Sequence, residues 1–478
     1  MSEKSYFLYG ASVQGIQDFI FRTNNLEEII GASRLVEKVC TTMFADKIEK
    51  GVHELKQDAN AIVNAAGNIK YIFSDYDSCQ KVVRDFPKQV ETMAPGITIS
   101  QAVVKMTGEC EDFSNAVDEL ERRLHIQRNR PMNQTSPRFM GVARSKDTNL
   151  PAVKFANGKR YDAASVQRLN AYRSNNESAR ISYGTDFDTI IHADGNAMGA
   201  LFSRFGNDQS KLKEFSSGLD ELVKKCVEKA KKETLNEINA DSPIVNNGEH
   251  INVIICSGDD LTVMCESQYA LPFVKKYLKS LEKHSKYLLD KIFGENRPYP
   301  YITACAGIAF LGAKNTFRDG YRIANMLCEH AKNDSFQHRQ GKVQPSCLLF
   351  YKQAGVIVGN LESSYYQAMH PAKGHSFQFG PYYLNKTNNR WTIERFLKLS
   401  SDSNNEIGIR NNLYDWVDWM NDDIDRSELQ RKHIAGFQGT QKFSESTSPE
   451  FRGKAYYYVG FDLMTYLSVL SNKKKRNK

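Results

Sequence analysis

The sequence predicts an α+β fold in which two copies of a βαββαβ unit form a pseudo-dimer, followed by a mainly helical domain. The same order of strand-like and helical stretches occurs in residues 1–106 and again in residues 185–354. From residue 355 to residue 478 helical stretches alternate with polar loops, and all three tryptophans lie there. A chain of 478 residues has room for about three domains of ordinary size.

The first unit is predicted from four strand-like apolar runs, with one helical stretch after the first run and another before the last. SYFLYGASV (5–13) opens it as a strand, and residues 24–51 carry apolar side chains at helical spacing. NAIVNAAGNIKYIFS (60–74) has the pattern of two strands around a Gly-Asn turn, and GITISQAVV (96–104) follows as the last strand. This order is that of the split-βαβ, or ferredoxin-like, unit.

The second unit repeats the order with a longer hairpin. FDTIIHADG (187–195) is predicted as a strand, residues 211–240 as a helix, and INVIICSGDDLTVMC (251–265) as a buried hairpin. A helix over 271–293 and a strand over 301–311 complete the unit. A further helix, 317–334, and the run CLLFY then close it.

Residues 107–184 are expected to form a basic and helical linker. Between Arg128 and Arg160 there are eight Lys or Arg residues and one acid, Asp147. Such a stretch either contacts nucleic acid or forms a solvated loop, and the sequence leaves both open. The basic end of the chain, KKKRNK, is expected to be a solubilising tail.

The bulk properties exclude several classes of protein. No apolar run approaches the length of a membrane span, and the first residues lack the pattern of a signal peptide. No two of the nine cysteines lie within four residues of each other, so CxxC spacing is absent. Reduced, buried thiols in a cytoplasmic protein are expected.

Two neighbouring carboxylates, Asp259 and Asp260, occupy the tip of the predicted 251–265 hairpin. A Gly-Asp dipeptide is a common turn signal, so in isolation turn chemistry is the simpler explanation. However, the first strand of the same unit also ends at an acid, Asp194, and the two strands are neighbours in this topology. The equivalent turn of the first unit, AAGNIK (65–70), has no acid. Acids that only one copy carries indicate a function rather than a requirement of the turn.

Three hard oxygen ligands without a nearby His or Cys favour Mg²⁺ or Mn²⁺ over zinc. Two such ions can assist an in-line displacement at a nucleoside triphosphate. Gly195 and Asn196, in the glycine-containing run 194–199, are expected beside the phosphates, together with Ser257 and Gly258 of the hairpin turn. Lys332 is a candidate phosphate contact, although a solvated lysine at a helix end is an equal alternative.

At this point the motifs resemble a known family, the large subunit of type III CRISPR effector complexes, within the palm polymerase/cyclase superfamily. Residues 13–37 and the AAGNIKYIF hairpin (65–73) resemble its first, degenerate palm, and a GGDEF-type diguanylate cyclase would lack them. The family's second, active palm is similar to three segments of this chain, HADGNAMGALF (192–202), CSGDDLTVMC (256–265) and ACAGIAF (304–310). The start of its C-terminal helical domain is similar to FGPYYL (379–384).

The resemblance implies a site and a reaction. In that family the active palm joins ATP into cyclic 3′–5′ oligoadenylates, a second messenger of antiviral defence. For this chain the resemblance implies that Asp194, Asp259 and Asp260 hold two metal ions. Nucleotide contacts at the palm–palm interface are implied for Gly31, Ala32 and Ser33.

The sequence departs from the family in three respects. No HD nuclease segment precedes the first palm, so DNA cleavage is not expected. The segment between the palms lacks the cysteines of the family's zinc site, so zinc is not expected. Ser257 replaces the first glycine of the GGDD motif, which should not remove metal binding.

The leading hypothesis is therefore a metal-dependent nucleotidyltransferase that makes a cyclic oligonucleotide from ATP and releases pyrophosphate. One alternative is a non-catalytic scaffold that binds guide or target RNA and other effector subunits. Another is a cyclase that makes a cyclic dinucleotide from other nucleoside triphosphates. Whether the protein acts alone, as a homo-oligomer or in a larger assembly stays open.

Overall fold

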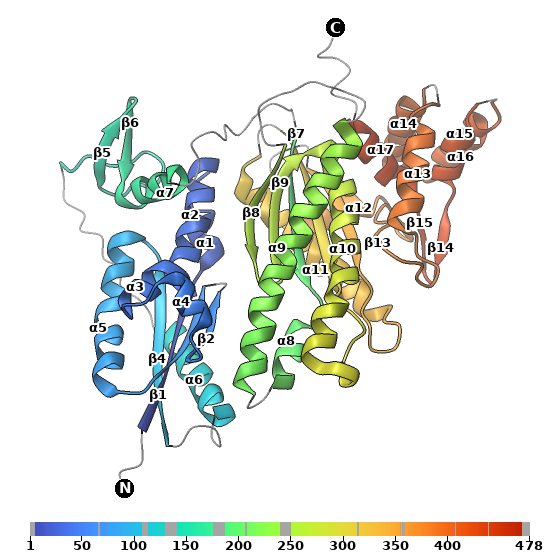
Figure 1. Cartoon of the computed structure of the whole chain (residues 1–478). Helices are drawn as coiled ribbons and strands as arrows, with labels where there is room; N and C mark the ends of the chain where they lie inside the picture. The colour runs from blue at the N-terminus through green and yellow to red at the C-terminus, as the bar shows by residue number, and fades with distance from the viewer. Residues whose placement is uncertain are drawn as a thin grey trace.

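The computed structural model contains two palm units side by side, with a mainly helical region beyond the second (Figure 1). The structure describes residues 5–65, 67–107, 113–129, 141–174, 187–205, 208–239, 250–312, 315–353, 355, 359–406, 408–437 and 439–470. The predicted α+β class with two βαββαβ palms is confirmed.

The first palm is built on a four-stranded antiparallel sheet in the order β2-β3-β1-β4. Its strands are β1 (Ser5–Gln14), β2 (Ala61–Ala65), β3 (Asn68–Phe73) and β4 (Thr98–Thr107). Its helices are α1 (Ile16–Ile20), α2 (Leu26–Lys38), a π-helical turn (Val39–Met43), α3 (Phe44–Lys47), α4 (Val52–Gln57), α5 (Tyr76–Met93) and α6 (Phe113–Arg128).

Alternation along β1 sends its side chains to two separate cores. Tyr9 stacks on Phe44 of α3 and belongs to the large core of the molecule. Leu8, its neighbour, packs with Leu120 of α6 in a smaller core on the opposite face of the sheet. Helix α6 therefore covers the face that α2, α3 and α5 leave open.

The second palm has a six-stranded sheet in the order β13-β11-β10-β7-β9-β8. Its strands are β7 (Phe187–Gly195), β8 (Ile251–Ser257), β9 (Asp260–Glu266), β10 (Ala304–Gly312), β11 (Cys347–Gln353) and β13 (Tyr382–Tyr383). Its helices are α8 (Met198–Phe202), α9 (Gln209–Asn239), α10 (Ser267–Phe293) and α11 (Phe317–Gln337), with 3-10 turns at Ser203–Phe205 and Gly294–Asn296. Strands β10, β7, β9 and β8 repeat the order β4-β1-β3-β2 of the first palm.

Helix α6 is the counterpart of α11, because each follows the last strand of its unit and packs on the two central strands. The predicted first unit, residues 1–106, ends before this helix. From the packing we infer that the first palm extends to Arg128.

The remaining elements form the region between the palms and the C-terminal region. Between the palms lie β5 (Ala152–Ala156), β6 (Lys159–Asp162) and α7 (Ala163–Arg173). The C-terminal region contains α12 (Leu361–Met369), β12 (His375–Ser376), α13 (Ile393–Ser403), α14 (Ile409–Asp422), α15 (Ile424–Ala435), α16 (Gln441–Thr447), β14 (Glu450–Arg452), β15 (Ala455–Tyr457) and α17 (Val459–Leu470). It is mainly helical as predicted, but it also contains a small sheet and supplies β13 to the second palm.

Two further predictions bear on these segments. Part of the basic stretch, residues 130–140, and the tail 471–478 lie outside the described residues. Within the described ranges, no helix is both long enough and apolar enough to span a bilayer.

Candidate functional site

The three predicted acids come together where β7 and the β8–β9 hairpin end. Strand β7 pairs with β9 from Asp188 to Ala193, so Asp194 follows directly beside the hairpin tip. Ser257 pairs with Asp260, which leaves Gly258 and Asp259 as the two turn residues. Asp259 is close enough to Asp194 for a hydrogen bond between the two carboxyl groups.

Two glycines make this geometry possible. Gly258 has a φ of +62°, the left-handed conformation that a tight hairpin turn needs and that glycine adopts most easily. Gly195 is required for space, because a Cβ there would lie 2.9 Å from Cβ of Asp259. The backbone after Asp194 therefore lies directly against the side chain of Asp259.

Burial and mutual repulsion make the charged forms of these acids unfavourable. Burial raises the pKa of Asp259, and the charge of Asp194 raises it further. The pKa of Asp260 rises to about 7, first through burial and then through the charges of Asp194 and Asp259. Oδ1 of Asp260 is buried without a hydrogen-bond partner, although 38% of the whole side chain is exposed. A cation at this point would relieve both costs.

Lys332, near the end of α11, brings a positive charge to the acids. Its ammonium group contacts Oδ2 of Asp194 and donates to the carbonyl of Gly195 at 3.0 Å. Burial acts to lower the pKa of Lys332, but the charge and hydrogen bond of Asp194 outweigh it and the pKa is raised. Of the two alternatives for this lysine, the solvated helix-end side chain is therefore wrong.

His192 is a site residue that the sequence reasoning missed. Its Nδ1 lies 3.5 Å from Oδ1 of Asp260, which corrects the expectation that no histidine is near the acids. The side chain is buried, and burial lowers its pKa to about 4, so it is neutral at ordinary pH. Because His192 precedes Asp194 by two residues on β7, strand alternation already placed both on one face.

Asn196, which the sequence places beside the phosphates, has a buried side chain. Its Nδ2 donates to Oγ1 of Thr303 at 3.0 Å, while its backbone N–H donates to the carbonyl of Thr303. Ala197 then adopts φ +57° and α8 begins. The loop leads into a helix as predicted, but the amide of Asn196 fixes the loop against Thr303, the residue before β10.

A cavity of about 280 Å³ joins the two palms at this site. Ser33 and Arg34 of α2 line it from the first palm, and Ser257 and Asp260 line it from the second. Gly31 and Ala32 do not line it among the described residues. A Cβ on Gly31 would lie 1.9 Å from the carbonyl oxygen of Arg168, so Gly31 lets α2 and α7 pack backbone to backbone.

The first palm has neutral groups at the matching positions. The registers align Ser12 with Asp194 and Asn68 with Asp260, and Ser12 donates a hydrogen bond to Asn68 at 2.9 Å. Arg128, at the end of α6, donates to Ser12 at 2.8 Å, much as Lys332 of α11 reaches Asp194. The two palms keep the same arrangement, but only the second has clustered carboxylates.

The donor set fits a hard divalent cation better than any other metal. The carboxylate oxygens at the hairpin are the ligands that Mg²⁺ and Mn²⁺ prefer, and the partnerless Oδ1 of Asp260 leaves one of them free to coordinate. In the described part of the chain, however, no three His, Cys, Asp or Glu side chains are already arranged to hold a metal ion. Asp194 is turned to Lys332 instead.

Comparisons with known proteins agree with this fold. The family model described as Cas10/Cmr2, second palm domain, matches residues 188–340. The structure is similar to that of Csm1 in T.onnurineus, with 12% identity and a TM-score of 0.57, covering 98% of this chain and 70% of that one.

Two Csm1–Csm4 cassettes, one in complex with pppApApA and one with one ATP, are also similar. Their identities are 13% and their TM-scores 0.56 and 0.55, with 97% and 98% of this chain and 70% of each of theirs covered. No curated protein matches the sequence. The predicted resemblance to the large subunit of type III CRISPR effector complexes is confirmed.

Proposed function

We propose that the chain is a nucleotidyl cyclase, from the premise that residues 188–340 match the family model described as Cas10/Cmr2, second palm domain. The reaction joins ATP molecules through 3′–5′ phosphodiester bonds into a cyclic oligoadenylate and releases pyrophosphate. Its setting is antiviral defence of the type III CRISPR kind. The observation that carries the proposal is the contrast between Asp194, Asp259 and Asp260 in one palm and neutral groups in the other.

The nucleotide class is supported by the relatives. Csm1–Csm4 cassettes have been solved in complex with one ATP, with AMPPNP, with pppApA, with cA3 and with cA4. All are similar to this chain in fold, with TM-scores between 0.50 and 0.55. ATP is therefore the first substrate to test, ahead of other nucleoside triphosphates that would give a cyclic dinucleotide.

The chain's own residues would bind and orient the reactants. Asp194, Asp259 and Asp260 would hold two Mg²⁺ or Mn²⁺ ions, which when bound polarise the attacking hydroxyl and neutralise charge on the phosphates. Lys332, which lies beside Asp194 and Gly195, would place its ammonium group where it could contact a phosphate of the nucleotide. Ser33 of the first palm and Ser257 of the second both line the cavity between the palms, where two nucleotides could meet.

One assay tests the proposal. Purified protein is incubated with Mg²⁺ or Mn²⁺ and each labelled nucleoside triphosphate, with and without RNA, and the products are separated. Cyclic oligoadenylate and pyrophosphate are expected from ATP, and Asp259→Asn with Asp260→Asn should abolish both. If the unchanged protein forms neither product under any condition, the cyclase assignment fails and a scaffold role takes its place.

Macromolecular partners are a second part of the proposal. The β5–β6 hairpin projects from the molecule (Figure 1), with Phe155 70% exposed, Arg160 opposite it in the register, and Lys154 and Lys159 in the same two strands. An exposed aromatic ring among cations suits the bases and phosphates of single-stranded RNA. Phe155→Ala should weaken RNA binding about tenfold, and unchanged binding would contradict this assignment. The Csm1–Csm4 cassettes suggest a Csm4-like protein as a further partner.

A further inference from the structure

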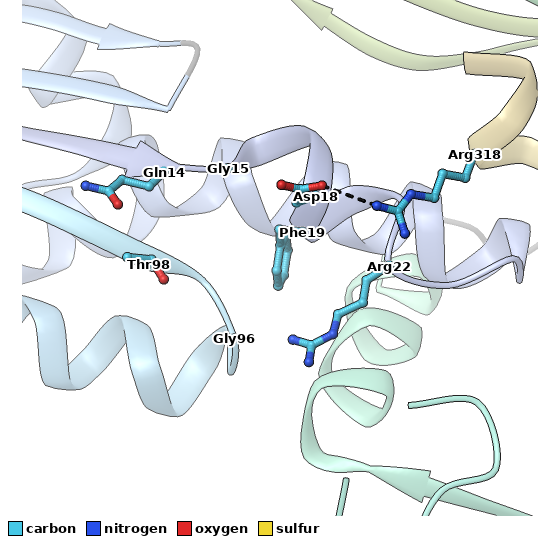
Figure 2. A pocket seen from close by; sticks show the side chains of 8 residues that line it. All are labelled: Gln14, Gly15, Asp18, Phe19, Arg22, Gly96, Thr98 and Arg318. Atoms are coloured by element: carbon cyan, nitrogen blue, oxygen red, sulfur yellow. Dashed lines mark ion pairs between the residues drawn. The ribbon is translucent and has the colours of Figure 1, made fainter. Parts of the chain in front are cut away.

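A second open pocket, of about 440 Å³, lies at another point of the palm–palm junction (Figure 2). Its walls come from the end of β1, from α1, from the start of β4 and from the first turn of α11. Within the described residues, none of the three acids lines it. The pocket is therefore separate from the proposed catalytic site.

Two guanidinium groups, one from each palm, face this pocket. Arg22 follows α1 of the first palm, and Arg318 is the second residue of α11 in the second palm. Arg318 pairs with Asp18 at 3.6 Å, but both side chains are more than half exposed, so the pair is weak. For Arg22 the described part of the chain offers neither an ion pair nor a hydrogen bond. The lining thus carries two positive charges and one negative charge.

The pocket is preformed rather than a chance gap between mobile side chains. Phe19, on its floor, is buried under the guanidinium of Arg168, whose carbon lies 4.4 Å from the ring centre. Arg168 also donates to the carbonyl of Phe19 at 2.7 Å, which fixes α1. Gly96, whose φ of +89° favours glycine, brings the backbone before β4 within van der Waals reach of Arg22. Thr98 adds a hydroxyl beside it.

We propose that this pocket binds the phosphate groups of a nucleotide, with Arg22 and Arg318 as the two contacts. Guanidinium groups bind phosphate oxygens in a bidentate manner. The N-terminus of α11, which is the positive end of its dipole, lies beside the pocket together with Arg318. The volume lies in the usual range for small-molecule pockets, about 300–1,000 Å³. The proposal does not depend on catalysis by the second palm.

Such a ligand would hold the two palms together. Phe21, next to Arg22, contacts Phe317 at 5.2 Å and Tyr321 at 4.3 Å between ring centres, and Phe317 is next to Arg318. A phosphate that bridges the arginines would therefore reinforce the contact that these rings make. The expected effect is a higher thermal midpoint of the full chain in the presence of the ligand.

The test is calorimetric titration of the full chain with pyrophosphate and with ATP in EDTA, where metal-dependent binding at the acids is absent. We expect pyrophosphate to bind the unchanged protein, and Arg22→Gln or Arg318→Gln to weaken binding about tenfold each. Arg122→Gln is the matched control, because Arg122 is an equally exposed arginine that pairs with Glu119 on α6. Asp259→Asn with Asp260→Asn should leave this binding intact, so that failure of the cyclase assay and failure of this site are distinguishable.

Three outcomes would overturn the proposal. The first is no pyrophosphate or ATP binding by the unchanged protein, or equal binding by the Arg22 and Arg318 variants. The second is binding of adenosine as tight as that of ATP, because the phosphates would then contribute nothing. The third is binding of a single-stranded RNA alone through these arginines, which would assign the pocket to a backbone phosphate. All five residues changed are exposed or at the hairpin tip, and thermal midpoints check that each variant folds.

Discussion

Nδ1 of His192 lies 3.5 Å from Oδ1 of Asp260, and the ring of His192 is 5.3 Å from the ring of Tyr321. Tyr321 in turn contacts Phe21 of the first palm. A neutral imidazole thus stands between the hairpin acid and the palm–palm contact. The imidazole does not neutralise the carboxylate, so the negative charge at the hairpin stays available for a cation.

Removing the hairpin charges should stabilise the protein without metal. Asp260 has its pKa raised to about 7, so the folded state holds this proton more tightly than the unfolded state. That contribution is complete below about pH 4 and is lost as the pH rises through about 7. Asp259→Asn with Asp260→Asn should therefore raise the unfolding free energy by about 1–2 kcal/mol at pH 8, less than the full shift implies because Asp260 is partly exposed, and by less at pH 5.

Thermal unfolding in EDTA at pH 5 and pH 8 measures this difference. His192, whose pKa is lowered, gives a slope of opposite sign, but it is present in both proteins and cancels in the comparison. Asp418→Asn, at an exposed carboxylate of α14, is the control and should change nothing. A less stable double variant at pH 8 would mean that the acids serve the turn itself.

Lys332→Gln should impair both the metal-free protein and the reaction. Without this ammonium group, Asp194 loses the one ion pair that it makes within the described residues, and stability in EDTA should fall by about 1–2 kcal/mol. If the lysine also contacts a phosphate, the rate with ATP should fall at least about tenfold, with Lys332→Arg partly active. Lys225→Gln, at a well exposed lysine of α9, is the control. Full activity of Lys332→Gln would restrict this residue to the metal-free state.

The two hairpin-site glycines should respond differently to alanine. At Gly195 a Cβ would strike Asp259, so Gly195→Ala should displace that carboxylate and reduce product formation more than about tenfold while the fold is retained. At Gly258 the space is open, and only the positive φ opposes a side chain, so Gly258→Ala should cost about 1–2 kcal/mol of stability. Activity assays and thermal midpoints of the two variants separate these effects. Equal activity in both would show that the position of Asp259 is not critical.

Gly31→Ala tests whether this residue packs helices or contacts a nucleotide. Its Cβ would overlap the carbonyl of Arg168, so α7 must move away from α2, and a loss of more than about 2 kcal/mol is expected. Ser33→Ala, two residues along the same helix and at the cavity, should instead leave stability unchanged and alter only the affinity for ATP. A Gly31→Ala protein of normal stability with weak ATP binding would reverse these two roles.

Much of the fold was predictable from the sequence, because strand alternation and turn residues are local signals. The β8–β9 hairpin and the position of Asp194 follow from them. The contact of Lys332 with Asp194 joins residues far apart in the sequence and depends on how α11 lies on the sheet, which local patterns do not determine. Gly31 was assigned to the nucleotide interface by resemblance, whereas its close approach to α7 depends on a helix that comes more than a hundred residues later. Helix α6 was assigned to the linker because of the basic residues that follow it, although its apolar spacing fits the sheet of the first palm.

Strand β13 determines where the second palm can be separated from the C-terminal region without exposing a sheet edge. It pairs Tyr382 and Tyr383 with Leu348 and Cys347 of β11, all of them buried. Without β13, that part of β11 would be an open sheet edge with apolar side chains on both faces, which is a template for pairing with another chain. A palm separated from the C-terminal region before Tyr382 should therefore self-associate, whereas one that keeps β13 has this edge protected.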